Sequence, residues 1–186
     1  MNFKYETERL ILKILTTDYA ALVLNFLYTN RDNFSPYEAA KTGNFYTVSF
    51  QRETLRLELS AFQKLQYIRY YVFKKGNDNE IIGTISFGNI LNKPYSSASI
   101  GYKFDKNHLH MGYATEAVSA AVLAVLNNTS IHRINAFVIP TNTPSIHLLE
   151  RIGFEYEGIC REFALINGEY TDHLHYALIN HRHAHL

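Results

Sequence analysis

The sequence predicts a single domain of the α/β or α+β class, in which helices flank a mixed central sheet of about seven strands. Strand-like and helix-like segments follow one another in the order β-α-α-β-β-β-α-β-α-β-β, and no repeat, low-complexity tract or linker separates them. The length of 186 residues also fits one domain with a sizeable core. We therefore expect one domain over residues 1–180 and a flexible tail over 181–186.

Composition limits the classes of partner. The apolar content of 47% is ordinary for a globular protein, and the net charge is only +1. This balance gives no broad positive field, so we expect no direct binding of nucleic acid or of a membrane surface. Cys160 is the only cysteine, which excludes an internal disulfide and fits a reducing compartment. No segment reaches the roughly 18 apolar residues of a membrane span, so we expect a cytoplasmic protein.

The N-terminal third is expected to hold one strand and two helices. Residues 9–15 alternate between apolar and other side chains, which predicts a half-buried strand. Asp18 is placed to cap a helix over 19–28, and a polar loop with chain breakers follows over 30–43. A less regular apolar pattern predicts the second helix over 50–65.

Three strands are expected in the middle of the chain. Aromatic and β-branched residues over 67–74, a short turn and a similar run over 80–87 predict a hairpin. Alternation over 98–104 predicts the third strand. Gly101 lies inside that strand, which indicates a bulge or the close approach of another group.

The last part of the chain is expected to form a long helix, a strand, a short helix and a hairpin. Small and apolar residues follow Gly112 at helical spacing. The nearly continuous apolar run 133–139 predicts a central strand with both faces buried. Thr143 is placed to cap the short helix. An Asn-Gly turn between 154–165 and 169–179 predicts the closing hairpin.

The turn before the long helix is the most informative segment of the chain. Gly112 and Ala114 are small residues at a strand-to-helix junction, where they let a ligand approach the backbone. The first N–H groups of a helix lack partners within it and lie at the positive end of its dipole, which suits a phosphate. A packing turn is the alternative explanation. The phosphate hypothesis gains its support from the motifs that follow.

Several spaced motifs resemble the GNAT acetyltransferase superfamily. Gly-Tyr-Ala-Thr-Glu-Ala at 112–117 is followed by Ile-His-Arg-Ile at 131–134 and by a longer motif over 142–158. The first strand, at 7–12, and the hairpin segment 167–173 look most similar to the Rim-type N-acetyltransferases, which modify the N-terminal residue of ribosomal proteins. The resemblance covers nearly the whole chain and implies a single GNAT-fold domain.

This resemblance implies that acetyl-CoA is the co-substrate and that backbone amides of the turn bind its pyrophosphate. The implied cofactor-binding residues are Tyr102, Lys103, Phe104, His110, Met111, Gly112, Tyr113, Ala114, Thr115 and Asn142. The loop departs from the superfamily pattern at Leu109, where Arg or Gln is usual, and at His110, where glycine is frequent. Loss of these features need not abolish binding, because backbone amides make most of the phosphate contacts.

The resemblance also indicates candidate residues for the acceptor side. Ser145 is a candidate acid for the departing thiolate, and Glu38 is a candidate base or amine anchor. Tyr37 and Asn89 are candidate substrate-binding residues. Each has an ordinary alternative, such as a surface hydroxyl, a solvated loop carboxylate or a turn residue. The histidines offer no evident third rigid ligand, so we expect no metal.

The expected activity is therefore transfer of acetyl from acetyl-CoA to a primary amine, most simply the N-terminal α-amine of a protein or peptide. We expect the protein to act as a monomer or a homodimer. Three alternatives stay open: a small amine as the acceptor, a non-catalytic coenzyme A-binding module, and a structural domain without cofactor. The sequence shows no acidic cluster, which disfavours polyamines as acceptors.

Overall fold

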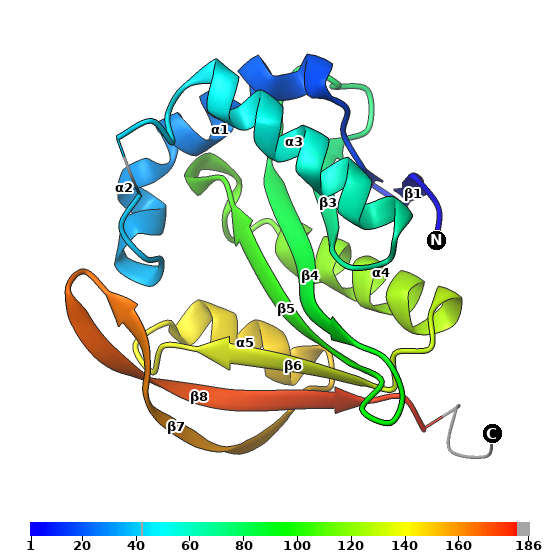
Figure 1. The fold of residues 1–186 in the computed structure, drawn as a ribbon, viewed down its shortest axis with the longest axis vertical. Coiled ribbons are helices and arrows are strands. Elements are labelled where there is room, and N and C mark those ends of the chain that lie inside the picture. The colour runs from blue at the N-terminus through cyan, green and yellow to red at the C-terminus, as the bar shows by residue number, and fades with distance from the viewer. Residues whose placement is uncertain (42, 182–186) are drawn as a thin grey trace.

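The computed structural model describes residues 1–41 and 43–181. It contains one sheet of eight strands in the order β1-β2-β3-β4-β5-β6-β8-β7 (Figure 1). Neighbouring strands are antiparallel except β5 and β6, which are parallel. The mixed sheet flanked by helices is confirmed. The expected tail lies outside the described residues beyond His181.

The elements follow the expected order, with one extra strand at the start and one short extra helix, α2, within the segment that was expected to be a loop. The first half contains β1 (Lys4–Glu6), β2 (Leu10–Lys13), α1 (Ala20–Thr29), α2 (Arg31–Phe34), α3 (Val48–Gln63), β3 (Ile68–Lys74) and β4 (Gly83–Leu91). The second half contains β5 (Ser97–Phe104), α4 (Tyr113–Asn128), β6 (Arg133–Val138), α5 (Thr143–Arg151), β7 (Glu155–Ile166) and β8 (Glu169–Ile179). Strand β1 was missed because three residues are too few to show an alternation.

Two predicted helix caps are wrong. Asp18 lies in a 3₁₀ turn, Thr17–Tyr19, and α1 begins after it without a side-chain cap. Helix α5 is capped by Asn142 instead of Thr143, since the Asn142 side chain accepts a hydrogen bond from the Ser145 amide at 3.3 Å. At α5, Asn142 and Thr143 have similar capping propensity, so sequence alone does not decide which of them caps the helix. At α1, the 3₁₀ turn places Tyr19 at the N-cap position, and Asp18 lies before it.

The prediction that both faces of the strand at 133–139 are buried is also wrong. Burial alternates along β6, where Ile134, Ala136 and Val138 are buried and the residues between them are partly exposed. The apolar run predicted burial on both faces because it includes Phe137. This residue lies on the more open face, where its ring stacks on the rings of Phe163 and His175 instead of entering the core.

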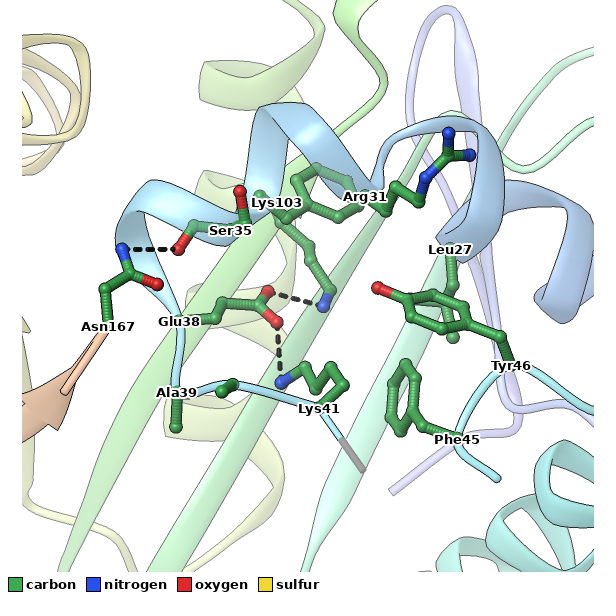
Figure 2. Close-up of a pocket in the computed structure, with 12 residues that line it drawn as sticks. Leu27, Arg31, Ser35, Glu38, Ala39, Lys41, Phe45, Tyr46, Lys103 and Asn167 are labelled. Carbon is green, nitrogen blue, oxygen red and sulfur yellow. Dashed lines mark hydrogen bonds and ion pairs between the residues drawn. The ribbon is translucent and has the colours of Figure 1, made fainter. Parts of the chain in front are cut away.

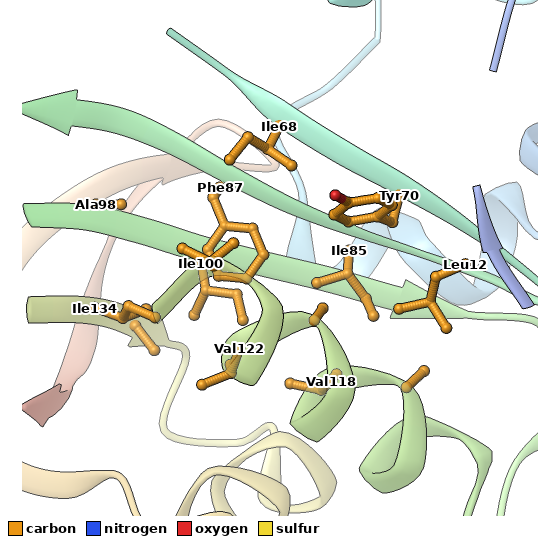
Figure 3. Packing of buried hydrophobic residues seen from close by; sticks show 14 of the residues in the cluster. Leu12, Ile68, Tyr70, Ile85, Phe87, Ala98, Ile100, Val118, Val122 and Ile134 are labelled. Atoms are coloured by element: carbon orange, nitrogen blue, oxygen red, sulfur yellow. The ribbon is translucent and has the colours of Figure 1, made fainter. Parts of the chain in front are cut away.

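Two hydrophobic clusters hold the sheet between its helices. The larger cluster joins one face of β2–β6 to α4 and α5, and Ile85, Ile100 and Val118 are among its members (Figure 3). The smaller cluster joins the other face, at β3, to α1 and α3. Burial of each such large side chain contributes about 1.5–3 kcal/mol. Within residues 1–41 and 43–181, no helix is long and apolar enough to cross a membrane.

The parallel strands β5 and β6 separate halfway along their length. Their pairing runs from Ser97 opposite Arg133 to Ile100 opposite Ala136. Beyond that point β5 stays paired with β4 and β6 stays paired with β8. The strands therefore form a V that opens toward α2 and the β7–β8 turn (Figure 1). The open half of β5 is the segment in which the sequence predicted cofactor contacts.

Candidate active site

Tyr102 of β5 and Ser145 of α5 meet at the opening between β5 and β6. The Tyr102 hydroxyl lies 2.7 Å from the Ser145 Oγ and donates to the Ser145 carbonyl oxygen at 3.3 Å. Burial raises the pKa of Tyr102 to about 12, although the hydrogen bond with Ser145 acts in the opposite direction. The phenol therefore keeps its proton at neutral pH. The structure thus joins the predicted acid Ser145 to a proton-bearing partner, whereas the sequence suggested only backbone contacts for Tyr102.

Ser145 is held in place by the first turn of α5. Asn142, at the end of the segment that follows β6, caps the helix through the Ser145 amide. This cap orients the first turn of α5, and with it the Ser145 hydroxyl, toward β5. The structure therefore shows Asn142 as a helix cap, and a contact between Asn142 and a cofactor stays a prediction.

The predicted phosphate-binding turn has the backbone that such a site requires. His110 and Gly112 both adopt left-handed conformations, with φ of 60° and 76°. Gly112 directly precedes α4, and no side chain caps this helix. The first amides of a long helix, those of Tyr113, Ala114 and Thr115, follow it and suit a pyrophosphate. The residues present therefore fit the phosphate-bearing group that the sequence predicted.

A distant arginine fastens this turn to the start of the sheet. The Arg9 guanidinium pairs with Glu116 at 2.6 Å, donates to the Met111 carbonyl oxygen at 3.0 Å and lies over the Tyr113 ring. Burial alone would raise the pKa of Glu116, but hydrogen bonds from Thr7 and Arg9 keep it below its usual value. Both charged residues stand in motifs that carried the resemblance, and that location was the only signal of their role.

The opposite face of β5 carries a charged cluster. The Glu38 carboxylate accepts from Lys103 Nζ at 2.5 Å and from Lys41 Nζ at 2.8 Å, one lysine on each oxygen (Figure 2). Burial alone would raise the pKa of Glu38, but the two lysines together keep it below its usual value. The structure therefore places Glu38 near the opening, as an ionised group with both oxygens engaged and not as a free base.

These charges line a cavity of about 140 Å³. Its other walls include the aromatic residues Phe34, Phe45 and Tyr46. The cavity is closed on one side by the β7–β8 turn, because Asn167 Nδ2 donates to the Ser35 carbonyl oxygen at 3.3 Å (Figure 2). Residues 31–41 form one wall; this part of the expected loop folds into α2 and a 3₁₀ turn, Ser35–Tyr37, followed by an extended segment.

A buried polar junction connects the cavity wall to the phosphate-binding turn. Asn30 Nδ2 donates to Asp105 at 2.7 Å, and the Lys106 amide donates to Asn30 Oδ1 at 2.9 Å. His108 lies 3.0 Å from the other oxygen of Asp105. Burial would raise the pKa of Asp105, but hydrogen bonds from Asn30, His108 and the Asn107 amide lower it. No pattern in the sequence indicates this junction, because Asn30 and Asp105 are far apart along the chain.

The remaining predicted site residues differ in their exposure and in their distance from the opening. Tyr37 is exposed and directly precedes Glu38. His110 and Met111 are exposed in the turn. The Phe104 ring is a core side chain that packs so closely on Gly83 that a Cβ there would lie 2.4 Å from it. Asn89 lies on a bulge next to Gly88, which pairs with Ser99, so it flanks the closed half of β5 and not the opening.

Comparisons with known proteins agree with this architecture. Residues 9–155 match the acetyltransferase (GNAT) domain family. The chain is 35% identical to the "Probable N-acetyltransferase YjcK" of Bacillus subtilis over 151 residues, which cover 81% of this chain and 83% of that protein.

Two solved structures show the same fold. The ribosomal-protein-S5-alanine acetyltransferase of Vibrio fischeri superimposes with a TM-score of 0.92 at 27% identity, covering 97% of this chain and 98% of that one. RimJ of Mycobacterium smegmatis, solved in complex with a CoA-disulfide, superimposes with a TM-score of 0.86 at 23% identity, covering 95% and 84%. The family match spans most of the chain, and the chain therefore belongs to the GNAT acetyltransferase family and is an acyltransferase enzyme.

Proposed function

We propose that this protein transfers acetyl from acetyl-CoA to the N-terminal α-amine of a protein or peptide, in the manner of the ribosomal-protein acetyltransferases. The observation that carries the proposal is the opening between β5 and β6, which has Tyr102 and Ser145 on one face and Lys103 with Glu38 on the other. A two-sided opening suits two substrates that meet in it. The S5-alanine acetyltransferase of Vibrio fischeri and the CoA-bound RimJ support both the acceptor and the co-substrate.

The residues of the phosphate-binding turn would hold the co-substrate. Amides at the start of α4 would bind the pyrophosphate, and the unpaired edge of β5 beyond Ile100 would hydrogen-bond the pantetheine arm. Acetyl-CoA supplies an activated thioester. Binding both reactants in one opening removes the entropy cost of bringing them together, which is a large part of the rate gain.

Ser145, with the help of Tyr102, would protonate the leaving group. The neutral amine forms a C–N bond to the acetyl carbon as the C–S bond breaks, and the Ser145 hydroxyl donates a proton to the departing thiolate. Tyr102 stays protonated at neutral pH, so its O–H can turn from the Ser145 carbonyl oxygen to Ser145 Oγ and donate a hydrogen bond there as the serine gives up its proton. Solvent then restores the serine proton.

Proton removal from the acceptor needs no strong base. An α-ammonium has a pKa of about 8, so water can take its proton at neutral pH. A weak base is sufficient even though Glu38, held as a carboxylate between two lysines, is not free to act as one.

Newly made ribosomal proteins are available in the cytoplasm, where we propose that the enzyme acts.

Calorimetric titration with acetyl-CoA, followed by intact-mass measurement on ribosomal N-terminal peptides, tests the proposal. We expect micromolar, stoichiometric binding and a gain of one acetyl group on the α-amine. Binding without transfer to any amine would favour a coenzyme A-binding module. Transfer to small amines but to no peptide would favour the small-molecule alternative. No binding by folded protein would overturn the assignment of the turn.

A further inference from the structure

We propose that the cavity beside Lys103 is a specificity subsite for a carboxylate that the acceptor carries close to its reacting amine. The proposal rests on the acetyl-transfer function above and adds a preference for acidic acceptors. The carboxylate has two possible sources: an acidic side chain next to a protein N-terminus, or the α-carboxylate of a free amino acid. The chemistry of recognition is the same for both.

The first argument is the balance of charge in the cavity. Its charged walls are Lys41, Lys103, Arg31 and Glu38. Glu38 neutralises only one of the two lysines that it contacts, so the trio carries an excess positive charge. Each ammonium has three donors and gives one to Glu38, which leaves donors for a second acceptor. The cavity is therefore suited to a carboxylate and unsuited to a further cation.

The second argument is the shielding of these ammonium groups from water. The side chains of Lys103 and Lys41 are only 21% and 30% exposed. Lys103 Nζ lies 4.8 Å from the centre of the Phe34 ring, and Lys41 Nζ lies 5.3 Å from that of Phe45. Ion pairs are stronger in such partly dehydrated surroundings than in water. Burial lowers the pKa of Lys103 despite Glu38, so an additional anion would stabilise its charged form.

Neighbouring charges do not reverse this balance. Arg69 and Glu58, on the elements behind Lys103, pair with each other at 2.6 Å and cancel. Arg31 points away from Glu38 toward the rim of the cavity (Figure 2), where Asp32 lies 3.6 Å from it. The excess positive charge is therefore concentrated at Lys41 and Lys103.

The third argument is position. Lys103 directly follows Tyr102 on β5, and their side chains lie on opposite faces of the strand, so a group bound at Lys103 lies across β5 from the Tyr102–Ser145 pair. A volume of about 140 Å³ equals the liquid volume of about five water molecules, which is enough for the carboxymethyl side chain of aspartate. An acceptor anchored there through its carboxylate would keep its amine at the opening.

Matched peptides test the preference directly. Three peptides that differ only at the second residue, beginning Ala-Asp, Ala-Asn and Ala-Lys, are compared by kcat/KM, and free alanine is compared with alaninamide. We expect about a tenfold advantage for Ala-Asp over Ala-Asn, the effect of one hydrogen bond between charged groups. If alanine exceeds alaninamide about tenfold while the peptides do not differ, the carboxylate belongs to a free amino acid. Equal values in both comparisons, or a preference for Ala-Lys, would overturn the proposal.

A pair of lysine variants locates the effect. Lys41→Gln should reduce the advantage of the acidic acceptor to about threefold or less, since it removes one of the two ammonium groups. Lys64→Gln removes an exposed lysine at the end of α3 and should leave the advantage intact. An unchanged advantage in Lys41→Gln would overturn the assignment to this cavity.

A binding measurement separates this proposal from the proposed function. The acetylated products of the Ala-Asp and Ala-Asn peptides are titrated into the protein with coenzyme A present. Tighter binding of the acidic product without any acetyl transfer would support the subsite and overturn the proposed function. Acetyl transfer with equal binding of the two products would support the function and overturn the subsite.

Discussion

The two faces of β5 are built from different chemistry. On the face of Tyr102, the neutral hydroxyls of Tyr102 and Ser145 meet at the start of α5. Their contacts depend on the backbone geometry of that helix and on the Tyr102 phenol, which burial keeps protonated. On the face of Lys103, Glu38 and two lysines form ion pairs in a small cavity, and the contacts depend on the balance of charge. A single strand can serve both because successive side chains point to opposite faces.

This difference separates two kinds of effect. Changes on the Tyr102 face should alter the binding and reaction of acetyl-CoA while leaving the choice of acceptor alone. Changes on the Lys103 face should alter the choice of acceptor while leaving acetyl-CoA affinity alone. The variants below test how far the two faces are independent, beginning with the largest expected effect.

Gly112→Glu should abolish most acetyl-CoA binding. A non-glycine residue in the left-handed conformation costs about 1–2 kcal/mol, which favours a turn of different shape that no longer fits the pyrophosphate, and the negative charge repels the pyrophosphate by a similar amount. We expect at least about a hundredfold loss of affinity by calorimetry. Gly76→Glu is the matched control, because Gly76 has a φ of 80° in a turn with open space around it. It should lower thermal stability comparably and leave the affinity unchanged.

Asp105→Ala should destabilise the junction that both faces share. It leaves the buried donor of Asn30 without its acceptor, which costs about 2 kcal/mol in the free energy of unfolding. Urea unfolding measures this loss, and Asp78→Ala, which breaks an exposed ion pair, is the control. Equal stability of the two variants would show that the junction does not hold the faces together.

The pH dependence of the same residue has a definite sign. The pKa of folded Asp105 lies below its usual value, so its contribution to stability is present above the unfolded pKa. This contribution is lost as the pH falls below about 4 toward the folded pKa. In Asp105→Asn, that part of the acid dependence of unfolding should disappear.

Local sequence motifs mark the elements of the Tyr102 face, whereas they do not mark the contacts of the Lys103 face. Gly112, the first turn of α4 and Ser145 stand in contiguous motifs whose geometry is set by residues close in the chain. The link between Glu38 and Lys103 joins residues from separate elements, and neither carries a local pattern that identifies its partner. The helix caps and strand β1 were predicted wrongly or missed because each depends on only a few residues, too few to form a recognisable pattern.

Ser145→Ala should slow turnover without weakening acetyl-CoA binding. A thiolate is a good leaving group, so we expect only about a tenfold loss of kcat, which is less than the roughly hundredfold or greater effect usual for a general acid. Tyr102→Phe should have a similar effect, and the double variant should lose little more, because the two hydroxyls act as one unit. Additive losses would show that they act separately. With its pKa raised to about 12, Tyr102 should contribute no change in rate between about pH 6 and 9.

Arg9→Met should have the smallest effect and should confine it to the Tyr102 face. The guanidinium holds Met111 and Tyr113 from outside the turn, at a loop where Leu109 offers no charge. Because the Arg9 side chain is 45% exposed, its ion pair with Glu116 is weak, and we expect about a fivefold loss of acetyl-CoA affinity. Lys4→Met, which breaks an exposed ion pair in β1, is the control. If Arg9→Met binds acetyl-CoA normally, the left-handed backbone at His110 and Gly112 suffices to shape the turn; if it also changes the choice of acceptor, the two faces of β5 are coupled.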